Sequence, residues 1–214
     1  MKITVPTSLN EITLGQYKHF LRIEEKADGD RFLQAKMIEI FCGVPLDKVI
    51  LLKLKDSEEM IQILSDLFQH KPELVKSFKI GNTKYGFHPQ LDDLTLGEYI
   101  DLDTFIGDWD NMERAMNVLY RPVLTELKDK YTIDKYVVEN DVLLLNMPMD
   151  AVMSAIFFLW NLGLDLSRII TNSLDNQGSE ALIQYLNSQQ SGDGINQFTD
   201  SLKEMLQELK ISLN

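Results

Sequence analysis

Residues 9–17 read Leu-Asn-Glu-Ile-Thr-Leu-Gly-Gln-Tyr, and residues 91–99 repeat the pattern as Leu-Asp-Asp-Leu-Thr-Leu-Gly-Glu-Tyr. Five of the nine positions are identical, and the other four carry mild substitutions. The interval of 82 residues is far longer than the unit of a solenoid protein. The similarity fades beyond the nine residues, so an ancient duplication and the separate reuse of a favourable helix start both remain open.

Each copy carries the signals that begin a helix. Thr13 stands three positions before Gln16, and Thr95 stands three positions before Glu98, which is the spacing of a capping box. In a capping box the threonine hydroxyl accepts a hydrogen bond from a free amide of the first turn, and the Gln or Glu side chain accepts one from the threonine amide. The motif therefore predicts two helix starts, and by itself it indicates no chemistry.

In most of the remaining chain, the apolar residues recur with the spacing of an α-helix. We predict a mainly α fold, a multi-helix globular protein with one small β-hairpin at about residues 74–88. Residues 2–5 are expected to form a short strand or an extended arm. Residues 123–138 are mixed and polar, and a loop or short extended structure is expected there.

Two further helices are predicted towards the end of the chain. Pro148 stands at a first-turn position, and the apolar residues after it indicate a long buried helix to about residue 170. An amphipathic helix is predicted from about residue 196. The most apolar segment, residues 151–164, is too short to span a bilayer.

The charge of the chain is unevenly distributed. Residues 1–90 contain 13 Lys and Arg and 12 Asp and Glu, whereas residues 91–214 contain 8 and 21, so the second half carries almost the whole net charge of −12. We therefore predict two lobes: residues 1–90 as an N-terminal helical lobe with the hairpin, and residues 91–214 as an acidic C-terminal helical lobe. The acidic half is not expected to bind nucleic acid, because phosphate contacts need cations.

The residues that most often carry chemistry are sparse. Cys42 is the one cysteine, so no intrachain disulfide is possible, and its apolar surroundings in the sequence predict a buried, inert thiol. The three histidines are too scattered to suggest a metal site. No signal peptide is recognised, and we expect an intracellular protein.

The densest polar cluster comprises Asp101, Asp103, Asp108 and Asp110. From residue 92 to residue 110 there are seven carboxylates and no cation. The spacing does not fit an EF-hand loop, because Phe105 and Met112 fall at ligand positions. We predict that these four aspartates form an acidic face that binds a partner. A metal-dependent hydrolase that uses the same carboxylates is the alternative.

Part of the second half resembles small helical proteins from the virion and tail modules of tailed bacteriophages, among them the crAss-like group. The resemblance covers about residues 91–170. It rests on the run at 97–103 and on four further stretches: Ala-Met-Asn-Val-Leu-Tyr-Arg-Pro at 115–122, Tyr-Thr-Ile-Asp-Lys-Tyr at 131–136, Met-Pro-Met-Asp at 147–150, and Phe-Phe-Leu-Trp-Asn-Leu-Gly at 157–163. The resemblance implies a role in phage morphogenesis, and it brings no catalytic residue.

The function expected from the sequence is therefore non-enzymatic protein–protein interaction, as a minor virion component or a tail assembly chaperone. The expected partners are other phage structural or assembly proteins, with homo-oligomerisation also open, in the host cytoplasm during assembly or in the virion. We expect no cofactor, no metal and no membrane association. A charge-mimic inhibitor of a basic host protein is a further alternative.

Overall fold

The structure is a computed structural model that describes residues 2–26, 29–128 and 130–175. The amphipathic helix expected from about residue 196 lies outside the described residues. None of the helices in this part of the chain combines the length and the apolarity that a bilayer crossing requires.

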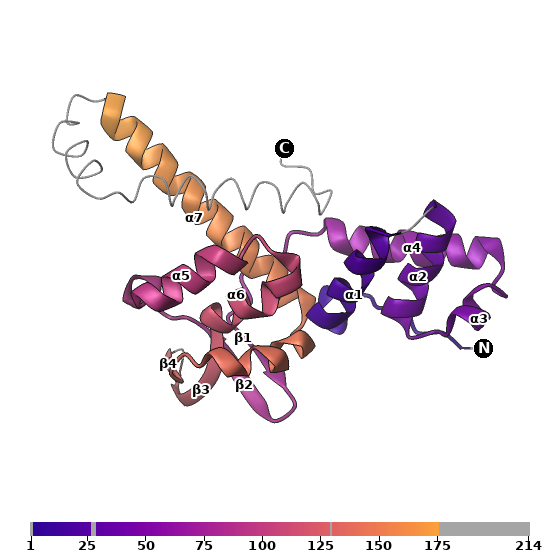
Figure 1. Cartoon of the computed structure of the whole chain (residues 1–214), viewed down its shortest axis with the longest axis horizontal. Helices are drawn as coiled ribbons and strands as arrows, with labels where there is room; N and C mark the ends of the chain where they lie inside the picture. Colours follow the sequence, from indigo (N-terminus) through magenta and orange to yellow (C-terminus); the bar gives the residue numbers. More distant parts are fainter. Residues whose placement is uncertain (1, 27–28, 129, 176–214) are drawn as a thin grey trace.

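The first part of the chain packs four helices together (Figure 1). A 3₁₀ helix, η1 (Leu9–Glu11), leads into them. The helices are α1 (Leu14–Glu24), α2 (Asp30–Cys42), α3 (Leu46–Val49) and α4 (Leu54–Gln69). Residues 2–5 form no strand; Ile3 and Val5 instead pack against a small apolar cluster of α2, α3 and α4.

A four-stranded antiparallel sheet follows, in the order β1-β2-β3-β4. The strands are β1 (Ser77–Ile80), β2 (Thr83–Phe87), β3 (Tyr120–Leu127) and β4 (Lys130–Ile133). The predicted hairpin is present as β1 and β2. The prediction of a mainly α fold with one hairpin is nevertheless wrong, because β3 and β4 join that hairpin and the fold is an α+β mixture.

Long-range contacts explain why the second pair of strands forms. Residues 85–87 of β2 pair with residues 120–122 of β3, more than 30 positions later. Tyr131 of β4 lies over Gly86, where a Cβ atom would come within 2.5 Å of the tyrosine ring. The Tyr131 hydroxyl donates a hydrogen bond to the Phe87 carbonyl at 2.7 Å. The glycine in β2 thus makes room for the aromatic ring that holds β4 against the hairpin.

The remaining α-helices lie above the sheet in the view of Figure 1. The α-helices are α5 (Leu96–Phe105), α6 (Met112–Leu119) and α7 (Met149–Asp175), and α7 projects beyond the other elements. The 3₁₀ helices are η2 (Leu91–Asp93), η3 (Trp109–Asn111) and η4 (Val138–Asn146). The long helix predicted after Pro148 is present as α7.

One large core joins the two halves of the chain. It includes Leu14 and Tyr17 of α1 together with Met112 and Met116 of α6 and the first turns of α7. The lobe boundary expected between residues 90 and 91 falls between β2 and β3, which are hydrogen-bonded neighbours. The hairpin therefore shares its sheet with the second half of the chain.

Candidate interaction site

The two copies of the repeated motif have the same local structure. The Thr13 hydroxyl accepts a hydrogen bond from the Gln16 amide at 3.2 Å, and the Gln16 side-chain oxygen accepts one from the Thr13 amide at 2.9 Å. Thr95 and Glu98 form the same two bonds at 3.3 and 2.7 Å. A three-residue 3₁₀ helix precedes each capping box. Both capping boxes therefore form as their spacing predicts.

The first copy docks on the chain between η4 and α7. The Leu14 amide donates to the Met147 carbonyl at 3.0 Å, and the Met149 amide donates to the Ile12 carbonyl at 2.8 Å. A Cβ atom on Gly15 would lie 3.0 Å from the Leu145 carbonyl oxygen, so glycine allows this close approach. The apolar residues of the motif are buried in the large core; they are Leu9, Ile12, Leu14 and Tyr17.

The second copy leaves two of the four equivalent positions exposed, whereas Leu91 and Leu94 pack partly against the large core. Leu96 is 75% exposed, whereas Leu14, at the equivalent position, is completely buried. Tyr99 is 45% exposed, and Ile100 beside it is 52% exposed. Since positions three and four apart share one side of a helix, these three side chains form one surface, the α5 face (Leu96, Tyr99 and Ile100).

The backbone of the second copy is open as well. Within the described residues, no backbone hydrogen bond reaches the Leu96 amide or the Leu94 carbonyl, the groups equivalent to those that hold Met147 and Met149. Nothing lies within 4 Å of a Cβ atom built on Gly97. The second copy therefore presents to its surroundings a surface of the kind that the first copy uses for internal docking.

The third helical residue of each copy also contacts a neighbouring element. The Gln16 side-chain amide donates to the Ile40 carbonyl of α2 at 2.9 Å. The Glu98 carboxylate forms an ion pair with Arg121 of β3 at 2.6 Å, and both side chains are buried. The amide of a glutamine side chain can donate to a carbonyl, and a glutamate carboxylate can pair with a guanidinium. The partners therefore explain why the first copy has glutamine at this position and the second has glutamate.

Burial and charge act together around this ion pair. Burial opposes ionisation of Glu98, but hydrogen bonds from Thr95 and the charge of Arg121 outweigh it and hold the pKa of Glu98 below its usual value. Burial and the Arg121 charge lower the pKa of His88, which is itself buried. The folded protein therefore favours an ionised Glu98 and a neutral His88.

We expect the free energy of unfolding to fall when the pH is lowered from about 7.5 to about 5.5. The folded-state pKa of His88 lies below its unfolded value of about 6.5. The stabilisation is therefore present above that value and is lost as the pH falls through the folded pKa. Urea unfolding at the two pH values measures the change. His88→Gln should lose less stability over this interval than the wild-type protein, and an equal loss in both would contradict the assignment.

The structure separates the four predicted aspartates by their contacts. Asp101 accepts a hydrogen bond from the Tyr136 hydroxyl at 2.7 Å. Asp108 caps η3 by accepting from the Asp110 amide at 2.8 Å. Asp103 has no hydrogen bond or ion pair within the described residues, and burial raises its pKa. Asp103 lies one helical turn after Tyr99. Burial raises the pKa of Tyr99, and the negative charge of Asp103 raises it further.

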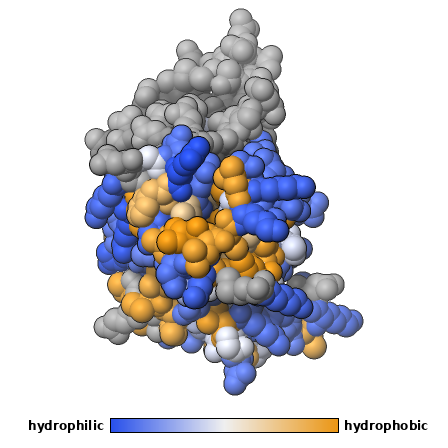
Figure 2. All heavy atoms as spheres, turned by 90° about the vertical axis from the view of Figure 1, so that its right-hand side faces the viewer, coloured by the Kyte–Doolittle hydropathy of each residue, from blue (hydrophilic) through white to orange (hydrophobic). Residues whose placement is uncertain are grey.

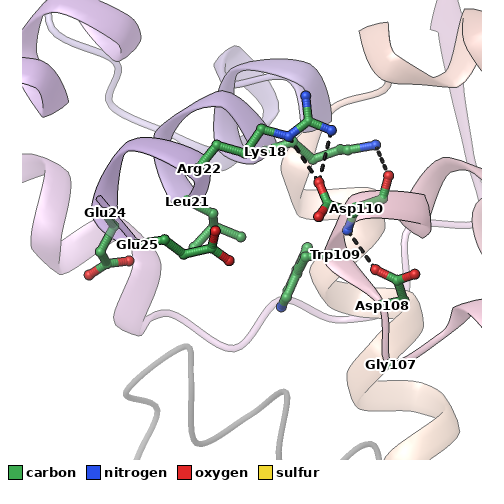
Figure 3. Close-up of a pocket in the computed structure, with 9 residues that line it drawn as sticks. All are labelled: Lys18, Leu21, Arg22, Glu24, Glu25, Gly107, Asp108, Trp109 and Asp110. Carbon is green, nitrogen blue, oxygen red and sulfur yellow. Dashed lines mark hydrogen bonds and ion pairs between the residues drawn. The ribbon is translucent and has the colours of Figure 1, made fainter. Parts of the chain in front are cut away.

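A groove of about 440 Å³ lies between α1 and the chain around η3 (Figure 3). Arg22 of α1 forms an ion pair with Asp110 at 2.8 Å. Lys18 donates to the Asp110 carbonyl at 2.8 Å and forms a buried ion pair with Glu113. Cations from the first half of the chain thus engage the end of the acidic cluster. Of the four aspartates, Asp103 beside the α5 face is the one best placed to meet a partner.

No group of three or more His, Cys, Asp or Glu side chains among the described residues is arranged to hold a metal ion. The metal-dependent hydrolase considered from the sequence therefore has no ligand set in this part of the chain. Burial raises the pKa of the half-buried Cys42 to about 11, which leaves the thiol protonated at neutral pH.

Sequence reasoning identified the capping residues but not the α5 face or Arg121. A signal for the face was present, because the apolar residues of residues 96–106 lie on more than one side of the helix. Leu102 and Ile106 enter the core, and Leu96, Tyr99 and Ile100 remain outside.

Comparison with known proteins shows that no protein-family model, no curated protein and no solved structure matches the chain.

Proposed function

We propose that this chain is a non-enzymatic protein–protein interaction protein in tailed-phage morphogenesis, as a minor virion component or a tail assembly chaperone. The resemblance of residues 91–170 to phage virion and tail modules supports the setting. The exposure of the α5 face supports the mode of action. The protein acts in the host cytoplasm during assembly, or in the virion.

The contrast between the two copies of the motif carries the proposal. In the first copy, burial of Leu14 and Tyr17 and two backbone hydrogen bonds attach α1 to the start of α7. In the second copy, equivalent apolar side chains and backbone groups are available to another molecule. Exposed apolar groups at a helix start with free backbone groups favour docking of a protein segment.

The charge around the α5 face indicates the chemistry of its partner. Asp92 and Asp93 are exposed at η2, and the unpaired Asp103 follows Tyr99 on the helix. Carboxylates next to apolar anchors favour a partner surface that combines apolar side chains with Lys or Arg. A Lys or Arg of such a partner would pair with Asp103 and offset the desolvation that raises its pKa.

The test is a binding measurement with two variants. We expect the Leu96→Ser/Ile100→Ser variant to bind its partner at least about tenfold more weakly, because the loss of two apolar anchors costs more than about 1.4 kcal/mol. The candidate partners are the purified proteins encoded by the genes that flank this one, and isothermal titration calorimetry gives the Kd.

The matched control is Leu127→Ser, which removes an exposed leucine at the end of β3, outside the α5 face. It should leave the Kd within about twofold of the wild-type value, as a neutral surface change does. Equal binding by the wild-type protein and the Leu96→Ser/Ile100→Ser variant would show that the α5 face is not the docking site. Turnover of a small molecule that depends on one polar side chain would contradict the non-enzymatic assignment.

A further inference from the structure

A groove of about 1000 Å³ lies between β4, the chain that flanks the β1–β2 hairpin, and the middle of α7. We name it the α7–β4 groove. It has more than twice the volume of the groove beside η3, which is about 440 Å³. Its apolar lining comes from four separate parts of the chain and includes Leu74, Phe87, Ile133, Phe158 and Leu162. Apolar walls with a few polar groups are typical of a binding site.

Three side chains with donor groups line the same groove: Lys76, His88 and Lys130. The Tyr131 hydroxyl lies 2.7 Å from the Phe87 carbonyl and 3.1 Å from the Lys76 carbonyl. Since His88 follows Phe87 and Lys130 precedes Tyr131, this contact brings the three donor residues close together. Neither lysine forms an ion pair within the described residues.

His88 presents an unused donor to the groove, although its side chain is only 8% exposed. Its Nδ1 atom accepts a hydrogen bond from the Gln90 amide at 3.3 Å, so the neutral imidazole carries its proton on Nε2. The Nε2–H group has no partner within the described residues, and it is not among the atoms that the protein encloses. A carboxylate or carbonyl oxygen of a ligand can therefore accept a hydrogen bond from it.

β4 offers a free backbone edge beside these donors. It is the last strand of the sheet, and among the described residues it pairs only with β3. The Asp134 amide donates to the Pro122 carbonyl of β3 at 2.8 Å. Because backbone groups turn to alternate sides along a strand, those of Tyr131 and Ile133 face away from β3. Both residues line the groove, so an extended peptide there can hydrogen-bond to them.

The apolar surface around α3 and α4 lacks these features. Figure 2 views that end of the molecule and shows apolar side chains gathered at its surface. They include the exposed Ile50, Leu51 and Leu54. Residues 47–59 contain three lysines and four carboxylates, so the charges there select no partner. The charges that line the α7–β4 groove are also mixed, since Asp92 accompanies the two lysines. Its ligand is defined instead by unused donors beside a free strand edge.

We propose that an extended segment of a partner protein binds in the α7–β4 groove and adds a strand to the sheet beside β4. Alternate apolar side chains of the segment contact Phe158 and Leu162, and a carboxylate of the segment accepts from His88 Nε2. The lysines of the groove pair with the same carboxylate. An alkyl carboxylate would match the walls and the donors but not the strand edge, so the structure favours a peptide. The site lies outside the α5 face, and this inference does not rest on the proposed function.

The first experiment uses six labelled peptides of six residues, blocked at both ends. Valine alternates with threonine in each, since both favour extended structure, and one aspartate is moved through the six positions. Fluorescence anisotropy with the full chain should give a Kd below about 100 μM for at least one peptide. The same peptide with asparagine in place of aspartate should bind at least about fivefold more weakly, because a charged acceptor forms the stronger hydrogen bond. Kd values above about 1 mM for all six would overturn the proposal.

Variants of the protein locate the binding. Leu162→Glu places a charge on an apolar wall, and Lys130→Glu reverses a donor. Each should weaken the best peptide at least about tenfold. The matched controls are Leu51→Glu and Lys53→Glu, which make the same changes at exposed residues outside the groove and should stay within about twofold of wild type. Thermal unfolding close to that of the wild-type chain shows that a variant is folded. Equal peptide binding by wild type and Lys130→Glu, or by wild type and a folded Leu162→Glu, would overturn the assignment of the groove.

Methylation of the peptide amides tests the added strand itself. Only alternate amides of a peptide strand face β4, so methylating one alternate set should abolish binding and methylating the other should spare it. Equal binding by both methylated peptides would overturn strand addition. Binding of dodecanoate with no binding of any peptide would make the groove a site for alkyl carboxylates, and would overturn the proposal too. The Leu96→Ser/Ile100→Ser variant should bind the peptides as wild type does, so failure here leaves the proposed role of the α5 face intact.

Discussion

Glu98→Gln should lower the free energy of unfolding by about 3–5 kcal/mol, which is the usual cost of leaving one member of a buried ion pair without its partner. The substitution keeps the cap, since Gln16 shows that glutamine fills the same role in the first copy. The loss falls on Arg121, whose guanidinium lies 2.6 Å from the Glu98 carboxylate with both side chains buried. Equilibrium urea unfolding followed by circular dichroism measures the change.

A matched control uses the same substitution at an exposed ion pair. Glu126 of β3 pairs with Lys84 of β2 at 2.6 Å, the same distance, but both side chains are substantially exposed. Glu126→Gln should therefore cost less than about 1 kcal/mol. If both variants unfolded at the same urea concentration, burial of the Glu98–Arg121 pair would not contribute to stability.

The residues that begin helices were predictable because their chemistry is local. A threonine and a Gln or Glu three positions later form a capping box from one turn of chain, wherever the helix then packs. The partners of Gln16 and Glu98 were not predictable in this way. Ile40 is 24 positions from Gln16, and Arg121 lies beyond α6 in β3. Only the folded arrangement explains why one copy has glutamine and the other has glutamate.

Short extended structure was one of the two expectations for residues 123–138, but β3 and β4 were not predicted as strands of one sheet, for a related reason. Tyr120 follows the last residue of α6 directly, so no turn marks the start of the strand. Pro122 and an irregular register near Val123 interrupt the alternation that predicts a strand. The tip of β3 is exposed on both sides, which removes the remaining pattern. These strands are defined by pairing with the distant β2.

The acidic cluster shows the limit of counting charges. Seven carboxylates without a cation in residues 92–110 predict a free anionic face. Lys18 and Arg22, about 90 positions away on α1, contact the end of that segment in the fold. Asp108 serves as a cap instead. What remains for a partner is the smaller region around Asp103, and its apolar neighbours do as much as its charge to define the site.

Equivalent leucines of the two motif copies provide a direct test of the different roles of these copies. Leu14→Ala should destabilise the protein by about 2–5 kcal/mol, because it removes a completely buried side chain from the core that joins α1 to α7. Leu96→Ala should change the free energy of unfolding by no more than about 0.5 kcal/mol, because that side chain is largely exposed. Both leucines occupy the first helical position after a capping threonine, so local helix energetics are matched.

Binding should show the opposite order. Leu96→Ala should weaken partner binding while the protein remains folded, because Leu96 is an anchor of the α5 face. Leu14→Ala, studied at a temperature where it is still folded, should bind the partner as the wild-type chain does, because the Leu14 side chain is completely buried and cannot contact a partner. Urea unfolding and calorimetry on the same two variants give both comparisons. Similar losses of stability in the two variants would show that the second copy is held in a core like that of the first, and the assignment of the α5 face as a docking surface would then fail.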